Sequence, residues 1–343
     1  MKHLLVVSCM LIGVGAGVAP VQAAGPAPRP ATQAAEPSIG DWLMRMHDAS
    51  RKRSYIGTFV VSSAAGNLSS ARIWHVCDGE QQMERIETLT GAPRSIFRRN
   101  DEVMTFLPEA KVVRTERRDS LGLFPNQLSA GDSSIAQFYA ARRTGSERVA
   151  GFDADVVELA PKDRLRFGYR VWSEKKSGLV VKLQTLDTDG RVLEQAAFSE
   201  LQLDAPVRME KLSQMMSNTE GYKVETQELV KTTPAAEGWS LRNPVAGFKP
   251  MSCYKRPVSG TAQDNTMQWI FSDGMASVSL FVEAFDRQRH LREVMLSMGA
   301  TQTLTRRIGD KPGDKDGGWW LTVVGEAPLT TLKAFAQGLE RGK

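Results

Sequence analysis

Between residues 54 and 115 the chain runs as a series of short segments in which apolar and polar residues alternate, separated by tight turns. The first segment, 55–61, is rich in β-branched and aromatic residues, and turn pairs such as Asp78-Gly79 and Asn100-Asp101 follow. This spacing predicts an antiparallel meander, because each strand can pair with the next through a short turn. The same alternation resumes after residue 148. The expected strands are 55–61, 71–77, 82–89, 94–98, 102–107, 111–115, 148–149, 154–159, 164–173, 179–187 and 192–203.

Helical periodicity is confined to a few short stretches. Ser38 can cap a first helix whose apolar face carries Trp42, Leu43, Met46 and Ala49. Further helices are expected at residues 135–139, at 208–217 and after Pro328.

A polar stretch that contains threonine and proline, residues 218–238, is interpreted as a flexible linker between two domains. The large domain then spans residues 38–217 and the small C-terminal domain spans 239–343. In the small domain the expected strands are 252–257, 267–272, 276–284, 301–308 and 318–326. The predicted fold class is therefore mainly β with a few helices (α+β).

The first 23 residues have the pattern of a secretory signal peptide. Lys2 precedes an apolar run, and small residues lead to Ala23, so cleavage is expected before Ala24. Lipidation at Cys9 is the alternative, but the apolar segment before it is very short. The apolar run is also shorter than the about 20 residues that a membrane span needs. We expect a periplasmic protein with a flexible leader at residues 24–37.

Charge and cysteine content limit the partners only loosely. The net charge is +5, and removal of Lys2, the one charged residue of the signal, leaves +4. A mild positive charge suits a partner with acidic or phosphate groups and does not require nucleic acid. In an oxidising compartment Cys77 and Cys253 could pair. Because they fall in different predicted domains, we expect two separate buried thiols.

Motifs that would indicate catalysis or cofactor binding are absent from the sequence. The histidines of the mature chain, His47, His75 and His290, are not spaced with other ligands as a zinc site requires. Ser173 and Lys176 fit a serine–lysine motif, but this serine is expected to end a strand rather than to open a helix. We therefore expect a binding protein, not an enzyme, without cofactor or metal.

A set of longer motifs resembles the RseB/MucB family, the periplasmic regulators of the envelope-stress sigma factor sigma-E. The motifs are 147–151 (ERVAG), 161–163 (PKD), 166–172 (RFGYRVW), 189–190 (DG), 193–195 (LEQ), 272–279 (SDGMASVS) and 323–326 (VVGE). The resemblance implies a large domain like the lipoprotein carriers LolA and LolB: a curved antiparallel half-barrel with helices on its concave side. The small domain should be an antiparallel sheet with a packed helix.

The resemblance also implies a function. Family members bind the periplasmic part of a membrane-bound anti-sigma factor (RseA/MucA-like) and shield it from regulated proteolysis. Lipopolysaccharide or the acyl chains of mislocalised lipoproteins weaken that shield. The small domain is expected to bind the anti-sigma factor, and the resemblance leaves homo-oligomers open. The alternative is a periplasmic lipid or lipoprotein carrier without a regulatory role.

Two groups of residues are the candidate sites. Five residues are expected to line a lipid cavity, with an ordinary hydrophobic core as the alternative: Trp42, Met46, Phe59, Val61 and Ile73. Trp74 is a further candidate for this group. Arginines of a basic stretch could contact phosphates or acidic groups, with a solvated strand edge as the alternative: Arg94, Arg98 and Arg114, beside Arg99, Lys111, Arg117 and Arg118. Trp319 and Trp320 are adjacent, so one indole should point away from the core and could anchor a partner.

Overall fold

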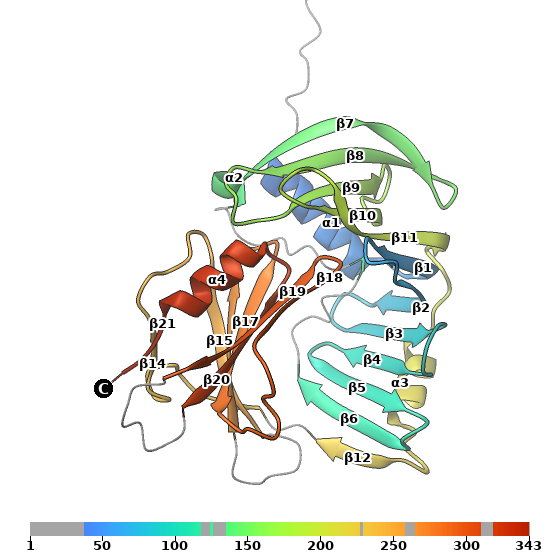
Figure 1. The fold of residues 1–343 in the computed structure, drawn as a ribbon. Coiled ribbons are helices and arrows are strands. Elements are labelled where there is room, and N and C mark those ends of the chain that lie inside the picture. The colour runs from blue at the N-terminus through green and yellow to red at the C-terminus, as the bar shows by residue number, and fades with distance from the viewer. Residues whose placement is uncertain are drawn as a thin grey trace, which may run out of the picture. The chain divides into compact units, whose positions relative to one another are not determined.

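Two β-sheets dominate the computed structural model, which describes residues 38–117, 124–125, 135–226, 229–257, 265–309 and 318–342 (Figure 1). The large sheet has twelve strands in the order β12-β6-β5-β4-β3-β2-β1-β11-β10-β9-β8-β7. Its strands are β1 Tyr55–Ser63, β2 Leu68–Cys77, β3 Gln82–Thr88, β4 Ser95–Arg99, β5 Glu102–Leu107, β6 Val112–Arg117, β7 Tyr139–Val149, β8 Phe152–Pro161, β9 Gly168–Glu174, β10 Val180–Leu186, β11 Val192–Leu203 and β12 Lys223–Thr226.

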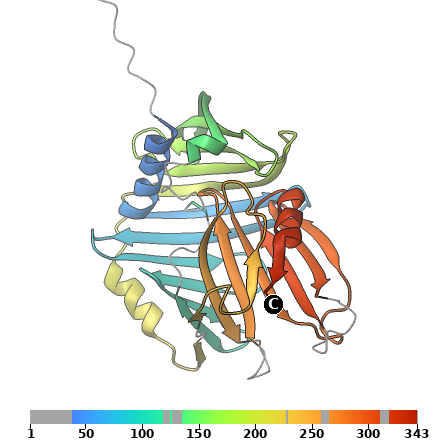
Figure 2. The same cartoon turned by 90° about the vertical axis from the view of Figure 1, so that its left-hand side faces the viewer.

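The expected meander is present: β1 to β6 lie one beside the next in chain order (Figure 2). Strand β11 closes the gap between the two halves by pairing antiparallel with β1, in a register that sets Phe198 opposite Phe59. Every neighbouring pair is antiparallel except β12 and β6, which run parallel, so the sheet is mixed. The mainly β fold predicted from the alternation is confirmed.

Helices pack on both faces of the large sheet. Helix α1, Ile39–Lys52, is capped by the Ser38 hydroxyl as expected, and its buried face lies in one core with Phe59 and Ile73. Helix α3, Met209–Ser217, contributes Leu212 and Met216 to a separate core with Met83 and Phe97. Side chains alternate across a strand, so these two cores lie on opposite faces. The resemblance implies that the helices lie together on one face of the sheet. Instead, α1 and α3 lie on opposite faces.

The small sheet has seven strands in the order β13-β15-β16-β17-β20-β19-β18. Helix α4, Leu329–Gly338, packs on it and buries Leu332 and Phe335 against Leu280 and Val323. The strands are β13 Val230–Lys231, β15 Lys249–Pro257, β16 Asn265–Ser272, β17 Ser277–Ala284, β18 Val294–Met298, β19 Thr301–Ile308 and β20 Trp319–Gly325; β14 Trp239–Leu241 and β21 Leu339–Arg341 form a separate pair.

Several elements differ from the prediction. Tyr139, expected in a helix, begins β7, because α2 ends one residue earlier (Ile135–Phe138). Strand β18 and most of β7 were not predicted. The stretch predicted to be a linker carries β12, which pairs with β6 of the large sheet, and β13, which pairs with β15 of the small sheet. The domain boundaries themselves stay a prediction.

Other expectations concern the termini and the cysteines. The signal peptide and the leader, residues 1–37, lie outside the described residues. No helix in the described part of the chain is long and apolar enough to cross a membrane. Cys77 and Cys253 are free thiols. Cys253 is buried as expected, and burial raises its pKa to about 11, whereas Cys77 is partly exposed.

Candidate functional site

The five residues predicted to line a lipid cavity come together in one core under α1. Met46, Phe59 and Ile73 are 2%, 5% and 1% exposed, and Trp42 and Val61 pack against them while keeping partial exposure. Phe59 contacts Phe124 and Phe198 with ring centroids 5.6 and 6.3 Å apart. In this structure the side chains fill the space between helix and sheet, so the set forms a packed core. Trp74 lies on the opposite face, beside Arg72 and Arg85, so the suggestion that it faces Phe59 is wrong.

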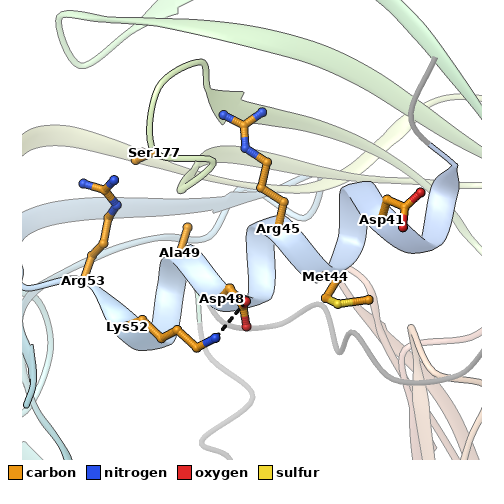
Figure 3. Close-up of a pocket in the computed structure, with 8 residues that line it drawn as sticks. All are labelled: Asp41, Met44, Arg45, Asp48, Ala49, Lys52, Arg53 and Ser177. Carbon is orange, nitrogen blue, oxygen red and sulfur yellow. Dashed lines mark hydrogen bonds and ion pairs between the residues drawn. The ribbon is translucent and has the colours of Figure 1, made fainter. Parts of the chain in front are cut away.

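An open pocket of about 450 Å³ lies along the outer side of α1 (Figure 3). Its lining is largely charged and comes from α1 and from the turn between β9 and β10. The lining residues are Asp41, Met44, Arg45, Asp48, Ala49, Lys52, Arg53 and Ser177. Lys52 pairs with Asp48 at 2.8 Å. The sequence did not single out this pocket, because its residues belong to the polar face of an ordinary amphipathic helix.

Arg45 ties α1 to the β9–β10 turn. Its guanidinium Nη2 donates to the carbonyl oxygens of Lys175, at 2.5 Å, and Lys176, at 3.3 Å. The arginine stem lies over Gly178, where an added Cβ would come within 2.9 Å of Arg45 Cγ. These contacts hold the helix over the core that contains Phe59 and Ile73. A further polar contact of α1 is the hydrogen bond that the Tyr55 hydroxyl donates to Ser50 O at 3.4 Å.

Arg98 is buried rather than presented to a partner. It is 2% exposed, and its guanidinium donates two hydrogen bonds of 3.1 Å to the Glu84 carboxylate and one of 2.7 Å to Asn100 O. His75 Nε2 lies 3.7 Å from Glu84, and burial lowers the pKa of this imidazole although the carboxylate acts in the opposite direction. Arg98 therefore has a structural role inside the sheet and is not available to a partner.

The other two predicted arginines are exposed. Arg114 lies 3.7 Å from Glu225 of β12, and Arg94 precedes β4 at the surface. Two further members of the basic stretch also have acidic neighbours, Arg99 with Glu102 and Arg117 with Asp101. Exposed pairs of this kind contribute roughly 0–1 kcal/mol each and remain open to exchange with a partner's charges.

The expectation of an exposed tryptophan in β20 is wrong. Trp320 is 6% exposed and stacks on His290 with ring centroids 4.7 Å apart. Trp319 faces the other side, packs against Trp239 and lies under the Arg341 guanidinium at 4.3 Å. The indoles do point to opposite faces, but a loop covers one and the C-terminal segment covers the other. Neither is a free anchor.

A buried charged network that the sequence did not reveal joins the large-sheet part to the small-sheet part. Arg166, fully buried, has its Nε 2.9 Å from Asp273 Oδ2, in an ion pair without hydrogen-bond alignment. Its Nη2 donates to Ala246 O at 2.5 Å, and its guanidinium lies 4.2 Å from the Phe138 ring centroid. Tyr139 donates a 3.1 Å hydrogen bond to the same Asp273 oxygen. Both residues of the ion pair fall in motifs quoted above, which is the only signal that sequence offered.

A second polar contact lies at the β18–β19 turn. Glu194 of β11 accepts a hydrogen bond from the Ala300 backbone N–H, and a Cβ added at Gly299 would lie 2.6 Å from its Oε2. Burial raises the pKa of the Glu194 carboxyl. Burial, and to a lesser extent Glu194, raise the pKa of Glu326 to about 7. Two carboxyl groups therefore interact at a place where both parts of the chain meet.

Among the described residues, no group of three or more histidine, cysteine, aspartate or glutamate side chains is placed to hold a metal ion. The features that the described residues do form are an apolar core under α1, exposed arginines and a buried ion pair.

Comparison with known proteins assigns these features to a family. Residues 38–216 match the model of the MucB/RseB N-terminal domain, and residues 233–340 match that of the MucB/RseB C-terminal domain. The sigma factor AlgU regulatory protein MucB of Pseudomonas aeruginosa is 29% identical over 315 residues, which cover 90% of this chain and 92% of that protein. The sigma-E factor regulatory protein RseB of Haemophilus influenzae is 25% identical over 308 residues, 89% of this chain and 91% of that protein.

The structural comparison agrees. The crystal structure of MucB in complex with MucA(peri) is 26% identical, has a TM-score of 0.69, and covers 89% of this chain and 100% of that chain. Since the family models span most of the chain, this protein belongs to the MucB/RseB family of sigma factor regulatory proteins, which are not enzymes.

Proposed function

We propose that this chain is a periplasmic negative regulator of the sigma-E envelope-stress response. It binds the periplasmic part of a membrane-bound anti-sigma factor and shields that part from regulated proteolysis. The observation that carries the proposal is the match, over nearly the whole chain, to MucB in its complex with MucA(peri). The signal pattern at residues 1–23 supports the periplasmic location.

We further propose that an acyl chain, from lipopolysaccharide or a mislocalised lipoprotein, is the releasing ligand and that it enters under α1. The packed core there includes Met46, Phe59 and Ile73, so the chain would replace helix side chains as the helix lifts. Each buried methylene contributes about 0.8 kcal/mol, so a few of them offset the loss of one or two hydrogen bonds of Arg45.

Two exposed arginines of the large-sheet part, Arg94 before β4 and Arg114 in β6, are proposed to receive the acidic groups of the lipid or of the anti-sigma factor. Guanidinium groups suit this task because they form paired, charge-assisted hydrogen bonds to phosphate and carboxylate.

Calorimetry with the mature chain, the anti-sigma periplasmic domain and a lipoprotein-derived acyl peptide tests the proposal. The chain should bind the domain and slow its cleavage by the periplasmic protease. Saturating lipid should weaken domain binding, and the domain should weaken lipid binding by the same factor, because the coupling free energy is shared. If lipid binds and leaves domain affinity unchanged, the carrier alternative replaces the sensor.

A further inference from the structure

The small sheet ends on an apolar strand that no described residue covers. Strand β18 is the last in the sheet order and pairs only with β19, so its outer edge is open within the described chain. Met295, Leu296 and Met298 are 55%, 52% and 58% exposed, and Leu291 just before the strand is 82% exposed. Exposed apolar side chains gathered in one segment mark interaction sites more often than scattered ones do.

Among the described residues, the other edge strands of the twelve-stranded and seven-stranded sheets are protected in ways that prevent strand addition. Strand β7 carries Arg142 and Arg143, which pair with Glu158 and Asp155 of its neighbour. Strands β12 and β13 are only four and two residues long. Charges and short length are the usual protection of an edge strand. The sequence of β18, VMLSM, contains neither a charge nor a proline.

The charge next to this edge is basic. Arg287 and Arg292 are exposed and have no ion-pair partner among the residues that the structure describes. The acidic residues of the same stretch are engaged within the chain. Glu283 bonds His290 and Arg289, Asp286 bonds Arg289, and Glu293 accepts from the Arg307 backbone N–H. A ligand of this edge should therefore be acidic as well as apolar.

We propose that β18 receives an extended segment of the anti-sigma factor's periplasmic part as an added strand. The segment would carry apolar side chains on both faces and acidic residues at the end that meets Arg287 and Arg292. Backbone hydrogen bonds supply affinity in strand addition, and the side chains supply selectivity. This inference rests on the proposed function and names the surface that performs it.

The position of β18 also explains how lipid could affect the partner. The strand runs into Gly299 and Ala300, which contact Glu194 and Ser63 of the large-sheet part. A segment bound along β18 would therefore end beside the junction of the two parts. A movement of the two parts at this junction would therefore shift β18, the edge strand that the partner is proposed to bind.

Two aspartate substitutions in the full mature chain test the inference, Leu296→Asp and Met298→Asp. Both positions are exposed, so the fold should persist, while the aspartate removes an apolar contact and places a charge against the apolar part of the added strand. Calorimetry with the recombinant anti-sigma periplasmic domain should show affinity reduced about tenfold or more. The matched control is Met251→Asp, which changes a 65% exposed methionine at a bulge of β15 and should alter affinity less than about twofold. Hydrogen exchange of residues 294–298 should slow when the wild-type complex forms.

The outcomes separate the two proposals. Wild-type binding with unaffected Leu296→Asp and Met298→Asp variants, and without protection of residues 294–298, would refute the β18 inference and leave the proposed function standing. No binding by the wild-type chain would refute both. If the wild-type chain instead self-associates through residues 294–298, and Leu296→Asp abolishes that association without affecting domain binding, the edge serves a second copy of the chain and the inference is wrong.

Discussion

Arg166 Nε lies 2.9 Å from Asp273 Oδ2, and both side chains are buried. Arg166 lies in the loop before β9 of the large sheet, and Asp273 lies in the turn between β16 and β17 of the small sheet. A buried ion pair adds little stability compared with apolar residues of the same size, because desolvation opposes the attraction. Removing the Asp273 charge is different, since the buried guanidinium of Arg166 then keeps only the partly exposed Asp163 carboxylate as an ionic partner. Gly247 belongs to this contact, because a Cβ there would overlap the Arg166 guanidinium.

The first prediction concerns this pair. Asp273→Asn keeps an oxygen for the Met275 and Ala276 N–H groups but removes the charge. Because Arg166 still pairs with Asp163, the free energy of unfolding should fall by about 2–3 kcal/mol, below the range for a buried charge left without a partner. The double variant Arg166→Met/Asp273→Asn removes both charges and keeps the oxygen for these N–H groups, so it should recover much of the loss. Urea unfolding measures both. Asp48→Asn, which breaks an exposed pair with Lys52, should cost less than about 1 kcal/mol. Equal losses of unfolding free energy in Asp273→Asn and Asp48→Asn would contradict the assignment of Arg166 and Asp273 as a buried ion pair.

The second prediction is a pH dependence from Glu326. Its pKa in the folded chain, about 7, lies above the ordinary 4.5, so the folded state holds a proton that the unfolded state releases between these values. Stability from this group is therefore present at low pH and lost as pH rises from about 4.5 to 7, by on the order of 1–3 kcal/mol. Glu326→Gln should flatten that part of the curve in urea unfolding at pH 5 and pH 8. Glu220→Gln, at an exposed position, should leave it unchanged.

The third prediction concerns the tie on α1. Arg45→Met removes the hydrogen bonds to the Lys175 and Lys176 carbonyls, so local opening of α1 should become easier by about 0.5–1.5 kcal/mol. Amide exchange in residues 39–52 should speed up. If the open helix is the lipid-competent state, affinity for an acyl peptide should rise by about 2- to 10-fold. Lys211→Met on α3 is the control, and it should change neither the amide exchange of residues 39–52 nor the affinity for the acyl peptide. Unchanged exchange in α1 would show that Arg45 does not hold the helix.

The fourth prediction addresses the proposed linker. A low-specificity protease should cut first within residues 218–238, in the stretch between β12 and β13, which pair with different sheets. Because Arg166 and Asp273 join the two parts, the fragments should co-elute on gel filtration, whereas the Asp273→Asn fragments should separate more readily. First cleavage within residues 140–200 would show that the boundary is misplaced.

Strands with one buried face and tight turns were predictable from local sequence. Strands Glu102–Leu107 and Thr301–Ile308 have the predicted bounds. Strands β7 and β18 were not predicted, because neither has one buried and one exposed face, and they lack this difference for opposite reasons. Residues Ala140 to Arg148 of β7 are exposed on both faces and mostly polar, and β18 is exposed on both faces and mostly apolar. Without a difference between the faces, a strand has no period of two.

Site residues were harder to predict because burial depends on distant neighbours. Arg98 looked like one member of a basic surface, yet Glu84 on the adjacent strand binds it inside the sheet. The indole expected to be exposed in β20 is covered, since Trp320 stacks on His290 of a preceding loop. The five residues under α1 were correctly grouped on one face, because helical and strand periodicity both determine faces locally.

The sequence by itself determined a strand-rich fold, the capped first helix, the grouping of Met46 with Phe59 and the family, because alternation, turn chemistry and motifs are encoded over short distances. Only the tertiary structure decided which charges are buried, which edge is open and how the two sheets meet. Tyr139 and Asp273 are 134 residues apart in sequence and form one hydrogen bond. Such a contact has no local pattern, since it exists only after both sheets have folded and excluded water from the charges between them.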